Sequence, residues 1–270
     1  NHFKNNNDFQ LAISFYDSVL KNTSDLSLRA ESYLGRGIIN FNNNKTDKAI
    51  DDYTFVIENF SKTKYFKQAL LGIQSIYVAN AQVDKYVDLI NSLPNLNVKK
   101  SEIDSLSYNA AFIKFSEGKY TYSRDNFIKY LNDFSKIHNP TVENDGVFVN
   151  QANYFLAESY RRLSDSSNAF LYYENIIKSN TKEYLEVALI FCARYNYRLK
   201  EYSSSNLYYL AIEVIASSNS LRREAIIRLM YGFNFLENNS AFVYAQKVLS
   251  LDKNDNWLIS IANTIIAREE

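Results

Sequence analysis

The stretch LAESYRRLSDSSNAFLYYENII, residues 156–177, contains two amphipathic segments separated by the polar turn SDSS. In its second segment an alanine, an aromatic residue and a branched aliphatic residue stand at offsets of zero, four and seven: Ala169, Tyr173 and Ile176. These offsets place the three side chains on one face of an α-helix. The stretch therefore predicts two helices joined by a short turn, with the three residues facing a core.

The same pattern recurs along nearly the whole chain, with first members spaced 37, 37, 37, 46, 36 and 36 residues apart. A period of this length is typical of helical repeat proteins, whose stacked units bury a continuous core. We therefore predict an all-α fold with a lone helix over about residues 8–21, six helix pairs, and a lone helix near residues 257–268. The other triplets are Ala12/Tyr16/Val19, Ala49/Tyr53/Val56, Tyr86/Ile90/Leu93, Ser123/Phe127/Tyr130, Ser205/Tyr209/Ile212 and Ala241/Ala245/Val248.

Small residues stand twelve positions before the first member of four triplets, which predicts close contact between the two helices of a pair. The chain has only 6 Gly and 2 Pro, so few residues would interrupt these helices. Before two other triplets the same position holds a larger residue, Gln74 or Leu229. The four small residues are Gly37, Ala111, Ala157 and Ala193.

The two best-matching stretches, YFLAESYRRLSDSSNAFLYYENII and GKYTYSRDNFIKYL, resemble the tetratricopeptide repeat (TPR). Gly118, Tyr120 and Phe127 stand where the repeat has its turn glycine and second-helix aromatic residues. The resemblance implies a right-handed superhelical α-solenoid of antiparallel helix pairs, with the first helix of each pair on a concave wall. The sequence departs from the family in its longer period, in lacking the consensus proline, and in having Tyr86, Ser123 and Ser205 where alanine is usual.

Three regions follow from the repeat. Residues 1–134 form the first half of the solenoid and start in mid-repeat, residues 135–149 form an inserted loop, and residues 150–270 form the second half and end in mid-repeat. Pro140 and Gly146 support the loop assignment. Because an array that starts and ends in mid-repeat has no polar caps, we expect it to be a segment of a larger one.

The resemblance also implies that partner proteins bind along the concave wall as extended peptides or helices. Arginine on an aromatic wall suits acidic or C-terminal peptides, since its planar fork binds carboxylates. The simpler interpretation, which we favour, is that these arginines are solvated or paired with Glu158, Glu186 or Glu224. We likewise favour core packing for Phe112 and Phe115. The candidate groove residues are Tyr108, Phe112, Phe115, Tyr154, Arg161, Arg162, Arg194, Tyr197, Arg198 and Arg223.

Further groove positions carried over from the family lie on the same predicted helices. They are Leu34, Ile38, Phe41, Leu71, Ser75, Val78, Glu158, Ile190, Ile226, Met230 and Phe233.

Catalytic and metal sites have no visible signal. The two histidines, His2 and His138, lie far apart, no P-loop or GxSxG pattern occurs, and the one cysteine, Cys192, stands in the apolar run VALIFCA, where we expect it to be buried. We expect no enzymatic activity, no cofactor and no metal. Lys and Arg number 30, as do Asp and Glu, so no basic excess points to nucleic acid.

The predicted function is a non-catalytic scaffold or adaptor in a hetero-oligomeric complex. The stretches ALLGIQSIYVANAQVDKYVDLINSLPNL and YFLAESYRRL are similar to TPR proteins of the bacterial cell envelope, of the BamD-like and Tol–Pal-associated type. This similarity implies a periplasmic, outer-membrane-associated location, with a cytoplasmic one as the alternative. Two other functions stay open: a pentatricopeptide-like nucleic-acid binder, and a regulatory arm of an enzyme whose catalytic domain lies outside this sequence.

Overall fold

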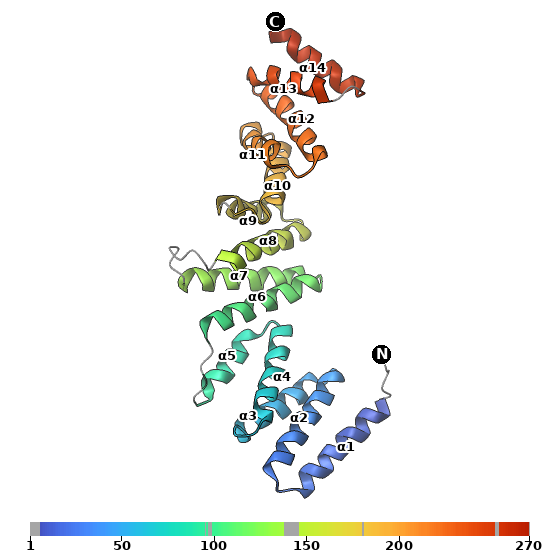
Figure 1. Cartoon of the computed structure of the whole chain (residues 1–270), viewed down its shortest axis with the longest axis vertical. Coiled ribbons are helices and arrows are strands. Elements are labelled where there is room, and N and C mark those ends of the chain that lie inside the picture. The colour runs from blue at the N-terminus through green and yellow to red at the C-terminus, as the bar shows by residue number, and fades with distance from the viewer. Residues whose placement is uncertain are drawn as a thin grey trace. The chain divides into compact units, whose positions relative to one another are not determined.

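The computed structural model describes residues 6–94, 96, 99–137, 146–179, 181–251 and 254–269. All regular structure in these ranges is α-helical, which confirms the predicted all-α fold (Figure 1). The predicted lone helices at either end are α1 (Asn6–Asn22) and α14 (Asn256–Glu269). None of the helices in these ranges is long and apolar enough to span a membrane.

The chain divides into two compact units, residues 1–119 and 120–270, which we call unit 1 and unit 2. After α1, unit 1 contains α2 (Leu26–Asn42), α3 (Thr46–Asn59), α4 (Tyr65–Ala79), α5 (Val83–Ser92) and α6 (Lys100–Ser116). Before α14, unit 2 contains α7 (Tyr120–Ile137), α8 (Gly146–Arg162), α9 (Ser166–Lys178), α10 (Leu185–Arg198), α11 (Tyr202–Ile215), α12 (Asn219–Phe235) and α13 (Ser240–Leu251).

The division of the chain lies earlier than the predicted inserted loop at 135–149. The helices α7 and α8 extend to Ile137 and from Gly146, so they include both ends of that loop, while residues 138–145 lie outside the described residues. The boundary between the two compact units falls between Lys119 and Tyr120. Helix α7 belongs to unit 2 because it packs along α8, where the Ser159 hydroxyl donates a hydrogen bond of 3.1 Å to the hydroxyl of Ser123.

The predicted repeating triplets form the core of both units. In five of the seven triplets every member is buried, which confirms the register. Leu93 of the third triplet is only half-buried. The triplet in α1, Ala12/Tyr16/Val19, is also half-buried, because α1 packs chiefly against α2.

Gly37 permits the predicted close packing between α2 and α3. A Cβ atom added to Gly37 would lie 2.8 Å from the ring of Tyr53, so the aromatic residue of the triplet occupies the space that glycine leaves. Gln74, which stands where a small residue is expected, instead donates a hydrogen bond of 3.1 Å to the hydroxyl of Tyr86. In the pair that contains Ala193, the hydroxyl of Ser205 donates a hydrogen bond of 3.0 Å to the carbonyl of Ala193.

Six turns from the first to the second helix of a pair share one backbone conformation. Each contains a residue in the left-handed region, with φ between 51° and 73°, and the next residue donates its N–H to the carbonyl five residues back. This is the Schellman arrangement, which satisfies carbonyls at the end of a helix. Only one of these residues is the glycine that the conformation favours. They are Asn44, Ala81, Gly118, Ser164, Lys200 and Glu237.

Two arginines form hydrogen bonds to backbone carbonyls where one helix is followed by the first helix of the next pair. Arg29 donates to the carbonyls of Leu20 at 3.0 Å and Thr23 at 3.3 Å. Arg222 donates to the carbonyls nine and six residues before it, Glu213 and Ala216, at 3.1 and 3.0 Å. Both therefore satisfy the last carbonyls of the preceding helix.

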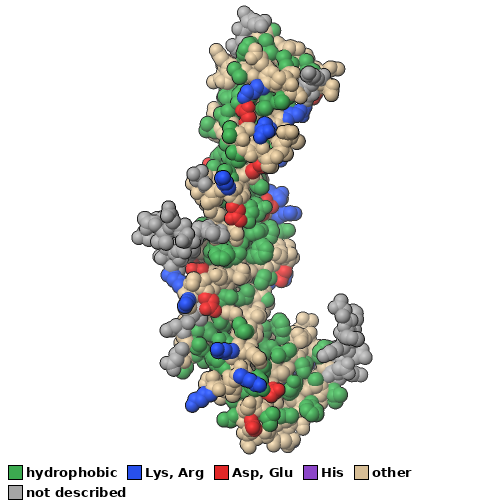
Figure 2. Space-filling view, in the orientation of Figure 1, with side chains coloured by type: hydrophobic (Ala, Val, Ile, Leu, Met, Phe, Trp, Pro, Cys, Tyr) green, Lys and Arg blue, Asp and Glu red, His purple; other side chains and the backbone are tan. Residues whose placement is uncertain are grey.

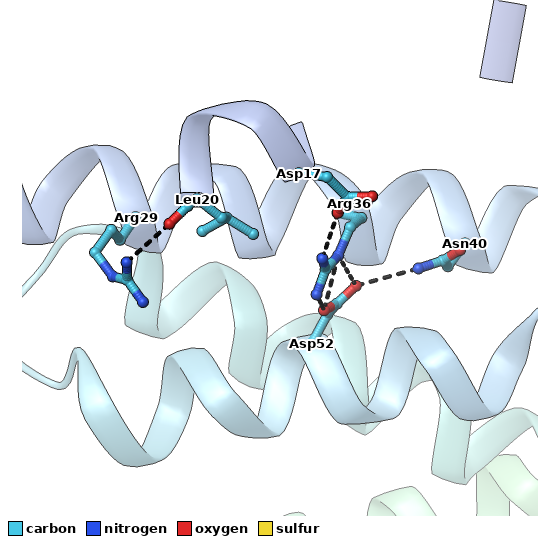
Figure 3. A network of polar contacts seen from close by, with 6 residues as sticks. All are labelled: Asp17, Leu20, Arg29, Arg36, Asn40 and Asp52. Carbon is cyan, nitrogen blue, oxygen red and sulfur yellow. Dashed lines mark hydrogen bonds and ion pairs between the residues drawn. The ribbon is translucent and has the colours of Figure 1, made fainter. Parts of the chain in front are cut away.

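In unit 1, a polar network joins α1, α2 and α3 (Figure 3). Arg36 of α2 donates to both oxygens of Asp52 at 2.5–3.2 Å and to Asp17 at 2.6 Å, while Asn40 donates to Asp52 at 3.1 Å. The hydrogen bond to Asp52 raises the pKa of Arg36 above its usual value, against the opposing effect of burial. The buried Asp52 carboxylate is thus compensated from within the unit.

Candidate functional site

Unit 2 contains a pocket of about 540 Å³ that we call the arginine pocket. Its lining comes mainly from α8, α10 and α12, the first helices of three successive pairs, with a tyrosine each from α9 and α11. Four arginines and two glutamates line it, so the charge of the lining is positive, and the remaining side chains are aromatic or aliphatic. The lining residues are Glu158, Arg161, Tyr173, Val187, Ile190, Phe191, Arg194, Tyr197, Arg198, Tyr209, Glu224 and Arg228.

Four of the ten candidate groove residues predicted from the sequence line this pocket: Arg161, Arg194, Tyr197 and Arg198. A fifth, Arg223, lines a second pocket of unit 2, described below.

Two other candidates in unit 2 contact aromatic rings instead. The ring of Tyr154 stacks on Tyr184 with centroids 4.1 Å apart. The guanidinium of Arg162 lies 5.8 Å from the ring centroid of Tyr120.

The three remaining candidates lie on α6 in unit 1. Tyr108 is buried, with 6% of its surface exposed, whereas Phe112 is 37% exposed and Phe115 is half-buried. The rings of Tyr108 and Phe112 stack with centroids 6.3 Å apart. Core packing therefore describes Tyr108 better than Phe112, for which the sequence had favoured it.

Four of the further groove positions carried over from the family are buried and line none of the three pockets described for the two units. Leu34, Val78, Ile226 and Met230 are all at least nine-tenths buried. Leu34, Ile226 and Met230 belong to the apolar clusters between helices, and Val78 packs with Val83 of α5. In contrast, Ile38, Phe41 and Leu71 are exposed.

Arg161 is held by a carboxylate of its own helix. Its Nε and Nη2 atoms donate to the two oxygens of Glu158 at 2.9 and 2.6 Å, and the Tyr173 hydroxyl also donates to Glu158. Only 8% of Glu158 is exposed. Burial opposes its ionisation, but the hydrogen bonds from Arg161 and Tyr173 outweigh burial and hold the pKa of Glu158 below its usual value.

Arg194 repeats this arrangement with a carboxylate from the next pair. Its Nε and Nη2 atoms donate to the oxygens of Glu224 at 2.8 and 2.5 Å, and the Tyr209 hydroxyl approaches the same carboxylate at 3.4 Å. The hydrogen bond from Arg194 lowers the pKa of Glu224. The interpretation of internally paired arginines is therefore correct for Arg161 and Arg194. Glu186 instead accepts hydrogen bonds from Ser217.

The two other arginines of the pocket, Arg198 and Arg228, form no ion pair with any carboxylate in the described residues. Arg198 is exposed, and the half-buried guanidinium of Arg228 lies 4.5 Å from the ring centroid of Tyr197. Arg228 is not among the residues predicted from the sequence, since the same positions were carried over from helix to helix. In each helix we take as reference the residue twelve positions before the first member of the following triplet. Arg161 stands four residues after Ala157, Arg194 one after Ala193, and Arg228 one before Leu229.

Unit 1 has a smaller pocket of about 250 Å³ around the Arg36 network. Its lining contains three basic residues and three acidic ones, and none of its side chains is aromatic. This balance gives it no charge preference for a ligand, unlike the arginine pocket. Its charged residues are Asp17, Arg36, Lys45, Lys48, Asp51 and Asp52.

Within the described ranges, no group of three or more His, Cys, Asp and Glu side chains could hold a metal ion. His2 and His138 lie outside those ranges. Cys192 is fully buried, as the sequence indicated, and burial raises the pKa of its thiol.

No known protein family profile and no curated protein sequence matches the chain. Solved structures that resemble it include the C-terminal part of a TPR repeat-containing protein from Cytophaga hutchinsonii, with a TM-score of 0.40 and 16% identity over 94% of this chain and 95% of that one. Another is the TPR domain of P58(IPK), with a TM-score of 0.23 and 14% identity over 97% and 99% of the two chains. The buried triplets, the small residues and the six matching turns show that the chain itself has a TPR-like fold.

Proposed function

We propose that the chain is a non-catalytic protein-interaction module, a scaffold or adaptor, and that unit 2 binds a peptide segment of a partner in the arginine pocket. The observation that carries this proposal is the lining of that pocket: four arginines, two glutamates and several aromatic rings from three successive helix pairs. Tyrosine and arginine are the side chains that most often dominate binding energy at protein interfaces.

The pocket is organised before any ligand arrives. Tyr173, Glu158 and Arg161 hold one another in place, as do Tyr209, Glu224 and Arg194, so little side-chain entropy is lost there on binding. Arg198 and Arg228 then supply positive charge that forms no ion pair with a carboxylate among the described residues. Their planar forks favour a ligand that carries carboxylates, such as an acidic peptide.

The same geometry supports a non-catalytic role. Both glutamates of the pocket have lowered pKa values and are held by arginine, so neither is a proton donor near neutral pH. The hydroxyls of Tyr173 and Tyr209 have raised pKa values, chiefly because they are buried. No side chain of the pocket is therefore activated as a nucleophile or base.

Membership of a bacterial cell-envelope assembly is a proposal that rests on the similarity of two stretches to envelope TPR proteins. A periplasmic, outer-membrane-associated location stays a prediction, with the cytoplasm as the alternative. Nucleic-acid binding has less support, because blue and red side chains are interspersed on the face shown in Figure 2. Salt-sensitive binding of RNA in a filter assay would reverse this ranking.

Selection of peptides from a random library on the whole chain tests the proposed function. We expect enrichment of acidic peptides, and Arg198→Gln with Arg228→Gln should weaken their binding about tenfold. Lys178→Gln is the control, since Lys178 is an exposed cation of unit 2 outside both described pockets of that unit. Peptides that bind the double variant as tightly as the parent would place binding elsewhere, and failure to enrich any peptide would contradict the proposal.

A further inference from the structure

A second pocket of unit 2, of about 480 Å³, shares Glu224 and Arg228 with the arginine pocket, so the two lie side by side along α12. We call it the tryptophan pocket. Its other lining includes Ile227 and Tyr231 of α12, and Trp257 and Leu258 of α14.

The two pockets differ in charge. Four arginines face two glutamates in the arginine pocket, whereas Arg223 and Arg228 face Glu224 and Asp255 in the tryptophan pocket. An acidic group therefore gains more electrostatic binding energy in the arginine pocket. An uncharged group loses less binding energy by lying in the tryptophan pocket. Since Glu224 is held by Arg194, its charge is compensated at the shared wall.

The tryptophan pocket has the features of an aromatic subsite. Trp257, the single tryptophan of the chain, is 69% exposed, and its ring centroid lies 6.4 Å from that of Tyr231. The Tyr231 hydroxyl is buried without a hydrogen-bond partner in the described residues, while the side chain of Leu258 is buried in the core below. Exposed tryptophan is costly to leave in water and is among the strongest contributors to binding once it is covered.

We propose that the two pockets form one two-part site for a peptide segment of a partner protein, with a carboxylate side chain at Arg228 and an aromatic side chain beside Trp257. This inference rests on the proposed peptide-binding function and adds the chemistry of the ligand. Arg228 couples the two parts, because it lines both pockets, lies over Tyr197, and forms no ion pair with a carboxylate among the described residues. Neither part alone provides both the charge and the apolar surface.

Four labelled synthetic peptides on a Gly-Ser background separate the contributions: one with Glu and Phe, one with Glu alone, one with Phe alone, and one with neither. The spacing between Glu and Phe is varied across the first set. Binding is measured by fluorescence anisotropy, and unlabelled peptides are then used to follow the emission of Trp257. Because the peptides contain no tryptophan, that emission reports the second pocket directly.

We expect the peptide with Glu and Phe to bind at least about tenfold more tightly than either single peptide and to shift the Trp257 emission. Arg228→Gln should remove most of the contribution of Glu, and Trp257→Ala most of that of Phe. Trp257 is largely exposed, so alanine there should leave the helix packed. Phe235→Ala is the matched control, an exposed aromatic residue of α12 outside both pockets.

Two results would overturn the inference in different ways. Peptides that bind by anisotropy, with unchanged Trp257 emission and unchanged affinity for Trp257→Ala, would contradict the two-part site but leave peptide binding by unit 2 intact. A lack of binding by all four peptides would contradict both the two-part site and the proposed function.

Discussion

At the scale of single residues, the adjacent arginines Arg161 and Arg162 have different surroundings. Arg161 is bound to the buried Glu158, whereas Arg162 lies over the ring of Tyr120. Neighbouring residues of a helix point about 100° apart, so one faces the arginine pocket while the other faces a different helix. Both arginines were predicted to lie on the same concave wall, because the sequence alone does not show which of them contacts a carboxylate.

Arg161→Ala should lower the free energy of unfolding by about 1 to 3 kcal/mol, because it leaves the buried Glu158 with Tyr173 as its hydrogen-bond donor. Arg162→Ala is the matched control and should change it by less than about 0.5 kcal/mol, as is usual for exposed substitutions. Chemical denaturation followed by circular dichroism measures both. Equal effects of the two substitutions would show that the ion pair with Glu158 does not stabilise the fold.

At the scale of helices and turns, the spacing of apolar residues was sufficient to predict the pairs. The triplets recur at nearly constant intervals, and their burial followed from helical geometry alone. The shared turn conformation could not be predicted in the same way. Five of its six left-handed residues are not glycine, so composition carries almost no signal, and the conformation is set by the hydrogen bond that closes the helix.

Lys200→Gly should raise the free energy of unfolding by about 0.5 to 1 kcal/mol, because glycine adopts the left-handed conformation without the steric cost that Lys200 bears at φ 63°. The reverse change, Gly118→Ala, should lower it by about 1 kcal/mol. A Cβ at Gly118 would meet no atom within 4 Å, so the loss would be conformational. Thermal unfolding of both variants tests this, and shifts of the same sign would contradict it.

At the scale of the whole molecule, the sequence predicted the repeat, whereas the two compact units and the full lining of the arginine pocket depend on contacts between helices. The boundary at Lys119 and Tyr120 falls inside a predicted helix pair, since it depends on how well α7 packs along α8. Arg194 and Glu224 are 30 residues apart, and only the stacking of α10 against later helices brings them together. Arg228 was missed because a long side chain reaches the pocket from outside the carried-over positions.

Unit 2 should lose stability in acid. The pKa values of Glu158 and Glu224 are lowered by folding, so their contribution is complete above the usual value of 4.5 and disappears as the pH falls through the lowered values. Denaturation from about pH 6 to about pH 3 should show this loss, and Glu158→Gln should reduce it. Glu201→Gln, an exposed substitution, should leave the pH dependence as in the parent chain. An unchanged pH dependence in Glu158→Gln would contradict the expectation.

Polar contacts between the helices of the core favour one order of stacking among the repeats. Gln74 with Tyr86, Ser159 with Ser123, and Ser205 with the carbonyl of Ala193 each occur at a different helix–helix contact. If the helices paired one repeat out of register, Tyr86 would face Gly37 or Ala111 in place of Gln74, and its hydroxyl would lose this hydrogen bond at a cost of about 1 to 3 kcal/mol. Repeats with similar apolar residues are therefore not interchangeable, and shuffling them should yield a misassembled chain.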